Sequence, residues 1–149
     1  MFEPQNASFS GEFTATMHDP SGHVPEITII RRSDPWRVKA KWAVEGSGVS
    51  GLASTATWIL TVLVESLGKG FEDQVAQKTV VVGAAASSHK YEEWIDINAA
   101  STFKDGANNE VFTEGPYKVT VTLTLKNGTA PVGIAGYHEF PAVVQFYDA

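Results

Sequence analysis

The segment from residue 34 to residue 46, DPWRVKAKWAVEG, constrains the fold more than any other part of this chain. Apolar residues, including Trp36 and Trp42, occupy every second position, and basic residues occupy positions of the other parity. Successive side chains of a strand point to opposite faces, so a strand here buries two indoles and exposes the cations. The basic residues of this face are Arg37, Lys39 and Lys41. The segment therefore predicts a strand that lies between a hydrophobic core and solvent.

Similar short segments recur along the chain and are separated by clusters of glycine, proline, asparagine and aspartate. No segment clearly favours a long helix, and this pattern is typical of an all-β protein. We predict a single antiparallel β-sandwich of seven or eight strands. The expected strands are Ser8–Met17, Glu26–Arg32, Trp36–Val44, Ala56–Glu65, Lys78–Val82, Tyr91–Ile97, Tyr117–Leu125 and Tyr137–Tyr147.

This pattern, with tryptophan in an early strand, resembles the immunoglobulin or fibronectin type III architecture. The resemblance covers most of the chain and implies a fold but no activity. The Cys-Trp-Cys hallmark of true immunoglobulin domains is absent, because the chain has no cysteine.

Several boundaries remain open at this point. The 149 residues fit one domain, 1–149, with residues 1–7 as a flexible N-terminal extension. Residues 52–67 fit a helical period as well as a strand, although their many β-branched residues favour the strand. Residues 98–115 read as a long loop. Asn127-Gly128 favours a tight hairpin turn, after which we expect the return strand to start late.

The charge distribution is uneven. Residues 31–41 contain five of the eleven basic residues and one acidic residue, a net charge of +4, whereas the rest of the chain carries −10. An acidic body argues against binding nucleic acid, because phosphate neutralisation dominates that affinity. The basic stripe has two interpretations: a charge-complementary contact with another protein surface, or a solvated face whose cations pair with carboxylates of the neighbouring strand.

Other sequence features exclude classes of site. Without cysteine there are no disulfides, cysteine-ligated metals or thiol catalysis. The most apolar run, Trp58 to Val64, is far shorter than the roughly 20 residues that span a membrane. The N-terminus lacks a signal-peptide pattern. We expect a soluble, cytoplasmic protein by default, with signal-less export as the alternative.

Few motifs suggest chemistry. Residues 46–51 spell G-x-G-x-x-G, but a nucleotide site needs a helix and an acidic residue that the following sequence does not supply. His18, Asp19 and His23 are weak metal-ligand candidates, because their spacing matches no established pattern. Residues 105–110 offer oxygen ligands of the kind that calcium takes. We expect no cofactor and no catalytic constellation.

The sequence therefore predicts a non-catalytic binding or assembly module whose partner is a protein, either another protein or a second copy of the chain. Trp94 shares its parity with Glu92 and Asp96, so it is expected on a polar face, where tryptophan is a candidate contact residue. The expected contact residues are Arg37, Lys39, Lys41 and Trp94. The alternatives are a carbohydrate-binding module that uses exposed aromatics and a metal-dependent hydrolase that uses His18, Asp19 and His23.

Overall fold

The structure is a computed structural model that describes all residues except 7–8, 21–26, 84–87, 129 and 149. The described residues form ten strands, two short 3₁₀-helices and no α-helix. None of them belongs to a helix that is long and apolar enough to cross a membrane. The strands are β1 (Phe2–Glu3), β2 (Ser10–His18), β3 (Ile29–Arg31), β4 (Trp36–Glu45), β5 (Thr57–Ser66), β6 (Glu72–Val81), β7 (Ser88–Ile97), β8 (Gly115–Asn127), β9 (Ala130–Glu139) and β10 (Val144–Tyr147), and the 3₁₀-helices are η1 (Val49–Gly51) and η2 (Ala100–Thr102).

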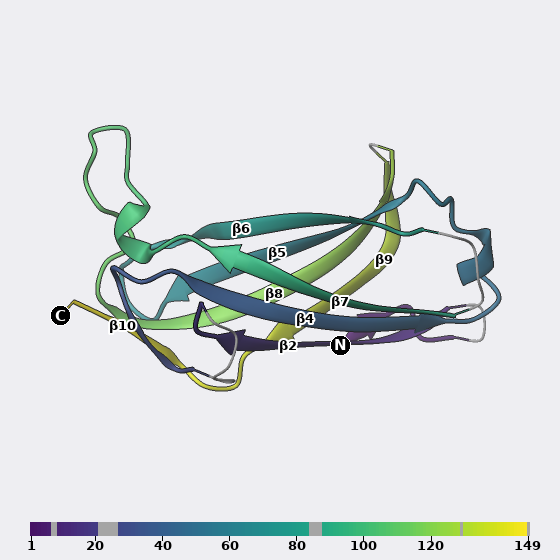
Figure 1. The fold of residues 1–149 in the computed structure, drawn as a ribbon, viewed down its shortest axis with the longest axis horizontal. Helices are drawn as coiled ribbons and strands as arrows, with labels where there is room; N and C mark the ends of the chain where they lie inside the picture. The colour runs from purple at the N-terminus through teal and green to yellow at the C-terminus, as the bar shows by residue number, and fades with distance from the viewer. Residues whose placement is uncertain (7–8, 21–26, 84–87, 129, 149) are drawn as a thin grey trace.

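The strands form two sheets that lie over one another (Figure 1). The smaller sheet has the order β2-β4-β7 and is antiparallel throughout. In the larger, seven-stranded sheet, β5 lies between β6 and β8. The other side of β8 pairs with β9 and β10, which continue to β1 and β3. The all-β, two-sheet prediction is thus confirmed. The fully antiparallel prediction is wrong, because β10 and β3 run parallel.

The sequence predicted too few strands because two segments do not show the alternation of apolar and polar residues by which the strands were identified. The expected strand Tyr137–Tyr147 is two strands, since the chain leaves the sheet at residues 140–143, where Pro141 cannot donate a ladder hydrogen bond. Within the expected N-terminal extension of residues 1–7, Phe2–Glu3 is a strand paired with β9, and residue 7 lies outside the described residues. Burial of the Phe2 side chain, which is 2% exposed and stacks on Phe9, holds this segment in place.

Other strand boundaries shift for local reasons. Residues 57–66 form strand β5 and not a helix, which fits their β-branched composition. β6 starts at Glu72, six residues before the expected Lys78. The sequence pattern missed these residues because a register shift opposite Val62 and Leu63 interrupts the alternation of side chains along β6. β9 begins at Ala130, directly after the turn, so the late return is wrong. Gly128 there has φ 66°, a left-handed conformation that glycine adopts freely.

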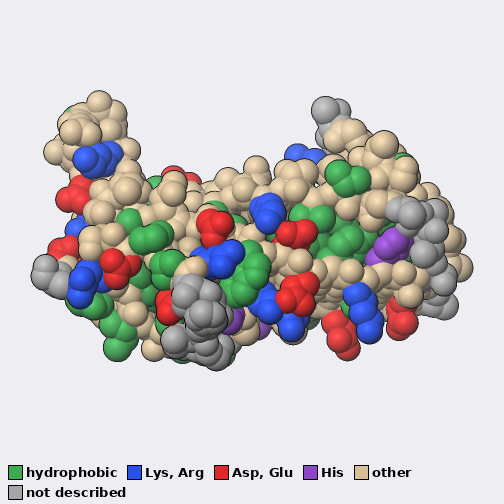
Figure 2. Space-filling view, in the orientation of Figure 1, with side chains coloured by type: hydrophobic (Ala, Val, Ile, Leu, Met, Phe, Trp, Pro, Cys, Tyr) green, Lys and Arg blue, Asp and Glu red, His purple; other side chains and the backbone are tan. Residues whose placement is uncertain are grey.

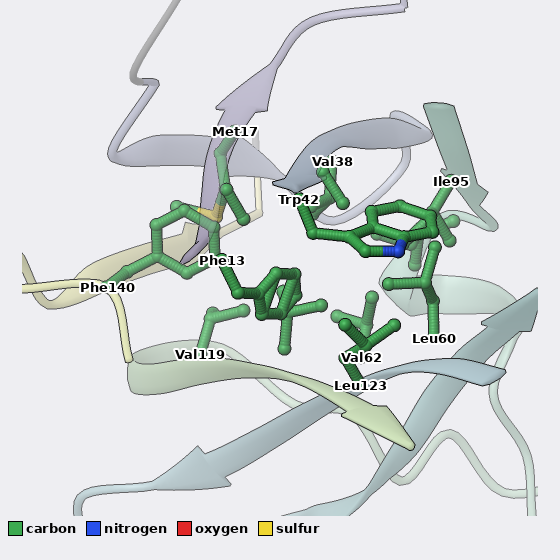
Figure 3. Packing of buried hydrophobic residues seen from close by; sticks show 14 of the residues in the cluster. Phe13, Met17, Val38, Trp42, Leu60, Val62, Ile95, Val119, Leu123 and Phe140 are labelled. Atoms are coloured by element: carbon green, nitrogen blue, oxygen red, sulfur yellow. The ribbon is translucent and has the colours of Figure 1, made fainter. Parts of the chain in front are cut away.

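The core lies between the sheets, and Figure 3 shows the packing of its side chains. Trp36, Trp42 and Trp58 are each at most 2% exposed, as predicted from their parity. Trp42 and Trp58 make an edge contact with ring centroids 6.2 Å apart, and Tyr91 stacks on Trp42 at 4.9 Å. Aromatic rings bury more area than other side chains, so this cluster is a main source of the apolar burial that joins the two sheets.

Side chains join the edge strands β6 and β7 of the two sheets. The Tyr91 hydroxyl donates to the Val82 carbonyl at 2.9 Å. The Lys78 ammonium donates to the Trp94 carbonyl at 2.9 Å and lies 3.0 Å from the Glu93 carboxylate. These contacts fix β7 relative to the larger sheet, and therefore fix the outer face that β7 shares with β4 and β2.

Candidate binding face

The outer face of the smaller sheet carries most of the residues that the sequence singles out. Its strands pair residue by residue, which arranges outward side chains in five rungs across β2, β4 and β7. We call this face the platform. In order from β2 to β7, its rungs are His18–Arg37–Asp96, Thr16–Lys39–Trp94, Thr14–Lys41–Glu92, Glu12–Ala43–Lys90 and Ser10–Glu45–Ser88.

The platform cations are paired with carboxylates of β7. The Arg37 Nε donates to Asp96 Oδ1 at 2.6 Å, and Lys39 Nζ lies 2.6 Å from Glu92 Oε1. Lys41 Nζ reaches the second oxygen of Glu92 at 4.0 Å. Figure 2 shows acidic and basic side chains adjacent to one another along this side of the molecule. The second interpretation of the stripe, pairing with the neighbouring strand, therefore describes its geometry.

The pairing affects the charge of Glu92. A hydrogen bond from Lys39 and the charges of Lys39 and Lys41 hold the pKa of Glu92 below its ordinary value, although partial desolvation acts in the opposite direction. The carboxylate is therefore ionised at neutral pH. Four acidic and four basic residues lie on the platform, so the face as a whole is neutral.

Trp94 lies among the cations of the platform. The Arg37 guanidinium carbon is 4.2 Å from the centroid of its ring, and Lys39 Nζ is 5.2 Å from it. These distances are within the range of cation–π attraction. The side chain is half-buried. The four expected contact residues thus lie on one face, and Arg37 and Lys39 both lie against the Trp94 ring.

His18 joins this cluster, which the sequence did not predict. It is the last residue of β2, one residue beyond the expected end of that strand at Met17, and it is 7% exposed. Its ring meets Trp94 edge-on with centroids 4.8 Å apart, and its Nε2 is 2.6 Å from the Thr16 hydroxyl. His18 reaches the cluster because it pairs with Arg37 across β2 and β4. The register between two strands has no local signal in the sequence.

A shallow depression lies next to the cluster, around the fourth rung. It encloses about 470 Å³, and the short side chain of Ala43 leaves it open between longer neighbours. Its polar rim consists of Glu12, Thr14, Lys41, Lys90 and Glu92. Its walls offer both charge signs.

The other candidate motifs do not assemble into sites. No group of three potential ligands that could hold a metal occurs among the described residues; His23 lies outside them. The G-x-G-x-x-G segment leads through η1 into strand β5, so it lacks the helix that phosphate binding needs. The Asp105 carboxylate accepts backbone N–H bonds from Asn109 and Ala107, which lower its pKa and use it to close its own turn.

Arg32, one of the basic residues of the 31–41 segment, is not on the platform. It is 7% exposed and donates from Nε to the Phe112 carbonyl at 2.8 Å. Its remaining nitrogens reach Asp148 at 2.6 Å and Glu110 at 3.3 Å. Arg32 therefore anchors the loop before β8 and the residues after β10, and it contributes nothing to a basic surface.

No protein-family model and no curated protein matches this chain. Among solved structures, it is similar to a β-glucosidase from Listeria innocua in complex with glucose, with a TM-score of 0.52 and 10% identity. That match covers 93% of this chain but only 16% of the glucosidase, so the chain spans a small part of that enzyme. It is also similar to the C-terminal domain of wzt, with a TM-score of 0.52 and 8% identity, over 100% of this chain and 78% of that domain. At these identities the likeness concerns the fold, an all-β arrangement in two sheets.

Proposed function

We propose that this chain is a non-catalytic assembly module with an immunoglobulin-like or fibronectin type III-like sandwich, and that a second copy of the chain binds to its platform. The observation that supports this most directly is the cluster of Trp94, Arg37 and Lys39. Tryptophan and arginine are enriched among residues that dominate protein interfaces. Here internal ion pairs hold the two cations in place before binding. Less side-chain entropy is then lost on association.

The order of charges along the platform favours self-association. The rungs at the His18 end carry a net +1, and the rung that contains Glu45 carries −1. If two platforms stack with their strands antiparallel, about a two-fold axis in the plane of the sheet and perpendicular to the strands, the ends exchange. Arg37 of one copy then faces Glu45 of the other, and Trp94 faces Lys90. This isologous arrangement repeats each contact twice.

Arg37 can make this second contact while keeping its first. Asp96 accepts the Nε proton, and a guanidinium has five N–H donors in all. The side chain is 23% exposed, so part of the group is accessible to the carboxylate of a second copy. The same cation can therefore stabilise the monomer and take part in the contact.

Sedimentation velocity of the purified chain over a concentration series tests this proposal. We expect a reversible dimer that weakens with added salt, because salt screens surface charge pairs. Trp94→Ala and Glu45→Lys should each reduce the dimer. The matched control is Glu72→Lys, an exposed carboxylate of β6 in the other sheet. A monomer at every concentration, or equal effects of Glu45→Lys and Glu72→Lys, would contradict the proposal.

A carbohydrate-binding module is the second candidate function. It is favoured by the fold-level likeness to a glucosidase whose structure was determined with glucose. If the platform bound sugar, Trp94 would be the stacking residue, and its fluorescence should shift when oligosaccharides are added. An unchanged emission spectrum across an oligosaccharide panel would exclude the platform as the sugar site.

A further inference from the structure

The outer face of the larger sheet differs from the platform in its chemistry. Its two central rungs run across β6, β5, β8 and β9 and contain no charged side chain. They consist of Gln77–Thr61–Thr122–Tyr137 and Thr79–Ile59–Thr124–Ala135. Four of these eight residues are threonines, one is a tyrosine and one a glutamine. Charges lie around them, at the Met1 ammonium, Glu3, Lys126 and the rungs that contain Glu65 and Glu139.

The absence of charged side chains on these two rungs distinguishes the larger sheet from the platform. Solvent-facing strands often carry lysine and glutamate, which oppose sheet-to-sheet aggregation, and the platform follows that rule. Here the exposed residues are instead apolar or carry an uncharged hydroxyl or amide group. Tyr137 is 46% exposed, and Leu63 and Val81 on flanking rungs are 36% and 58% exposed. Four neighbouring strands give the neutral surface a width of about 14 Å.

A groove lies on this face beside Tyr137. It encloses about 430 Å³, and its walls include Thr122, Thr124, Ala135 and Tyr137. Glu3 and Met1 also line it, and the Met1 ammonium donates to the Tyr137 carbonyl at 2.8 Å. The wall surface is mostly apolar, with hydroxyl groups spaced along it. An aromatic ring and threonine methyl groups can cover the C–H face of a ligand, while the hydroxyl groups both donate and accept hydrogen bonds.

We infer that this groove binds a neutral oligosaccharide. Such a ligand has C–H faces that can pack on the Tyr137 ring and the threonine methyl groups. Its hydroxyl groups can hydrogen-bond to the threonine hydroxyls, and it carries no charge, like the two central rungs. A protein partner fits it less well, because threonine is under-represented among residues that dominate protein interfaces. An anionic ligand meets one cation, the Met1 ammonium, and the Glu3 carboxylate at the same rim, so the groove has no net positive charge to attract it. The inference gives the second candidate function a different site and does not depend on the dimer.

Chemical-shift mapping with ¹⁵N-labelled protein tests the site. The probes are cellohexaose, maltohexaose, xylohexaose and laminarihexaose at millimolar concentration, with hexagalacturonate as the anionic comparison. We expect at least one neutral probe to shift the amides of residues 61, 122, 124 and 137, and hexagalacturonate to bind more weakly. No shift with any neutral probe, or shifts confined to β2, β4 and β7, would overturn the inference.

Variants then separate the groove from the platform. Tyr137→Ala should weaken the binding probe about tenfold, the loss expected for one stacked ring. Thr122→Val with Thr124→Val removes two hydroxyls, keeps side-chain shape and strand preference, and should also weaken it. Trp94→Ala is the matched aromatic control on the other sheet and should leave the affinity unchanged. Equal affinity of Tyr137→Ala and the parent chain would refute the groove as the site.

The outcomes for the two proposals are distinguishable. Loss of sugar binding in Tyr137→Ala with an unchanged dimer supports the groove as the sugar site, independently of the dimer. Loss of the dimer in Trp94→Ala with unchanged sugar binding supports the platform as the dimer contact, independently of the sugar site. Sugar binding that is lost in Trp94→Ala and retained in Tyr137→Ala would overturn the groove and assign carbohydrate to the platform.

Discussion

Two arginines with equally short ion pairs should contribute very differently to stability. Arg32 lies 2.6 Å from Asp148, and Arg37 lies 2.6 Å from Asp96. The Arg32 side chain is 9% exposed, whereas that of Arg37 is 23% exposed, and only Arg32 also donates to a backbone carbonyl, that of Phe112. Replacing each arginine with methionine keeps much of the apolar stem and removes the charge.

The expected magnitudes follow from those contacts. A charged hydrogen bond to a buried carbonyl contributes about 1.5–3 kcal/mol, and its loss leaves the Phe112 oxygen without that donor. The carboxylates of Asp148 and Glu110 are 62% and 46% exposed, so each of these pairs adds at most about 1 kcal/mol. We therefore expect Arg32→Met to lower the free energy of unfolding by about 2–4 kcal/mol.

Arg37→Met is the control. Asp96 is 79% exposed, so its pair with Arg37 contributes about 0–1 kcal/mol, and the contact with Trp94 adds about 0.5–1 kcal/mol. Urea unfolding followed by far-UV circular dichroism measures both variants. A loss below about 1 kcal/mol for Arg32→Met, or equal losses for the two variants, would refute the assignment of Arg32 as an internal anchor.

Three further predictions concern stability. Because folding lowers the pKa of Glu92, the ionised carboxylate stabilises the folded state at pH values above its ordinary pKa of 4.5. The difference in free energy of unfolding between the parent chain and Glu92→Gln should therefore vanish as the pH falls through the folded-state pKa, and a difference that persists at lower pH would contradict this. In Gly11→Ala the new Cβ would lie 2.6 Å from the Ala43 carbonyl oxygen, so urea unfolding should show a loss of about 1–3 kcal/mol, against little change for Gly106→Ala, which meets nothing within 4 Å. Tyr91→Phe removes a hydrogen bond between the sheets and should cost about 1 kcal/mol in the same assay; an unchanged midpoint would show that this bond does not hold β7 in place.

The sequence predicted the parts of the fold that depend on local alternation. The strand from Trp36 to Glu45 was expected at 36–44, and its buried and exposed faces were assigned correctly. The strand at 57–66 was preferred over a helix on composition alone. Both segments have one face against the core, so their period of two is complete and visible.

The elements that were missed depend on contacts distant in the sequence. β1 is two residues long, and it forms through pairing with β9 and burial of Phe2. β6 lost its period to a bulge, and β10 pairs with β3 across more than a hundred residues. No local propensity encodes such pairings, because their stability comes from the partner strand.

The same distinction explains what the sequence could say about function. Parity placed Arg37, Lys39 and Lys41 on one face, but it could not show that Glu92 and Asp96 lie opposite them, since that depends on the register of β4 against β7. Counting charges therefore overstated the stripe, and Arg32 in the same segment is internal. The neutral face of the larger sheet was missed for the converse reason. Each threonine is unremarkable on its own strand, and only the four aligned strands bring them together around Tyr137. Binding surfaces on sheets are properties of rungs, and a rung can be read only after the register is known.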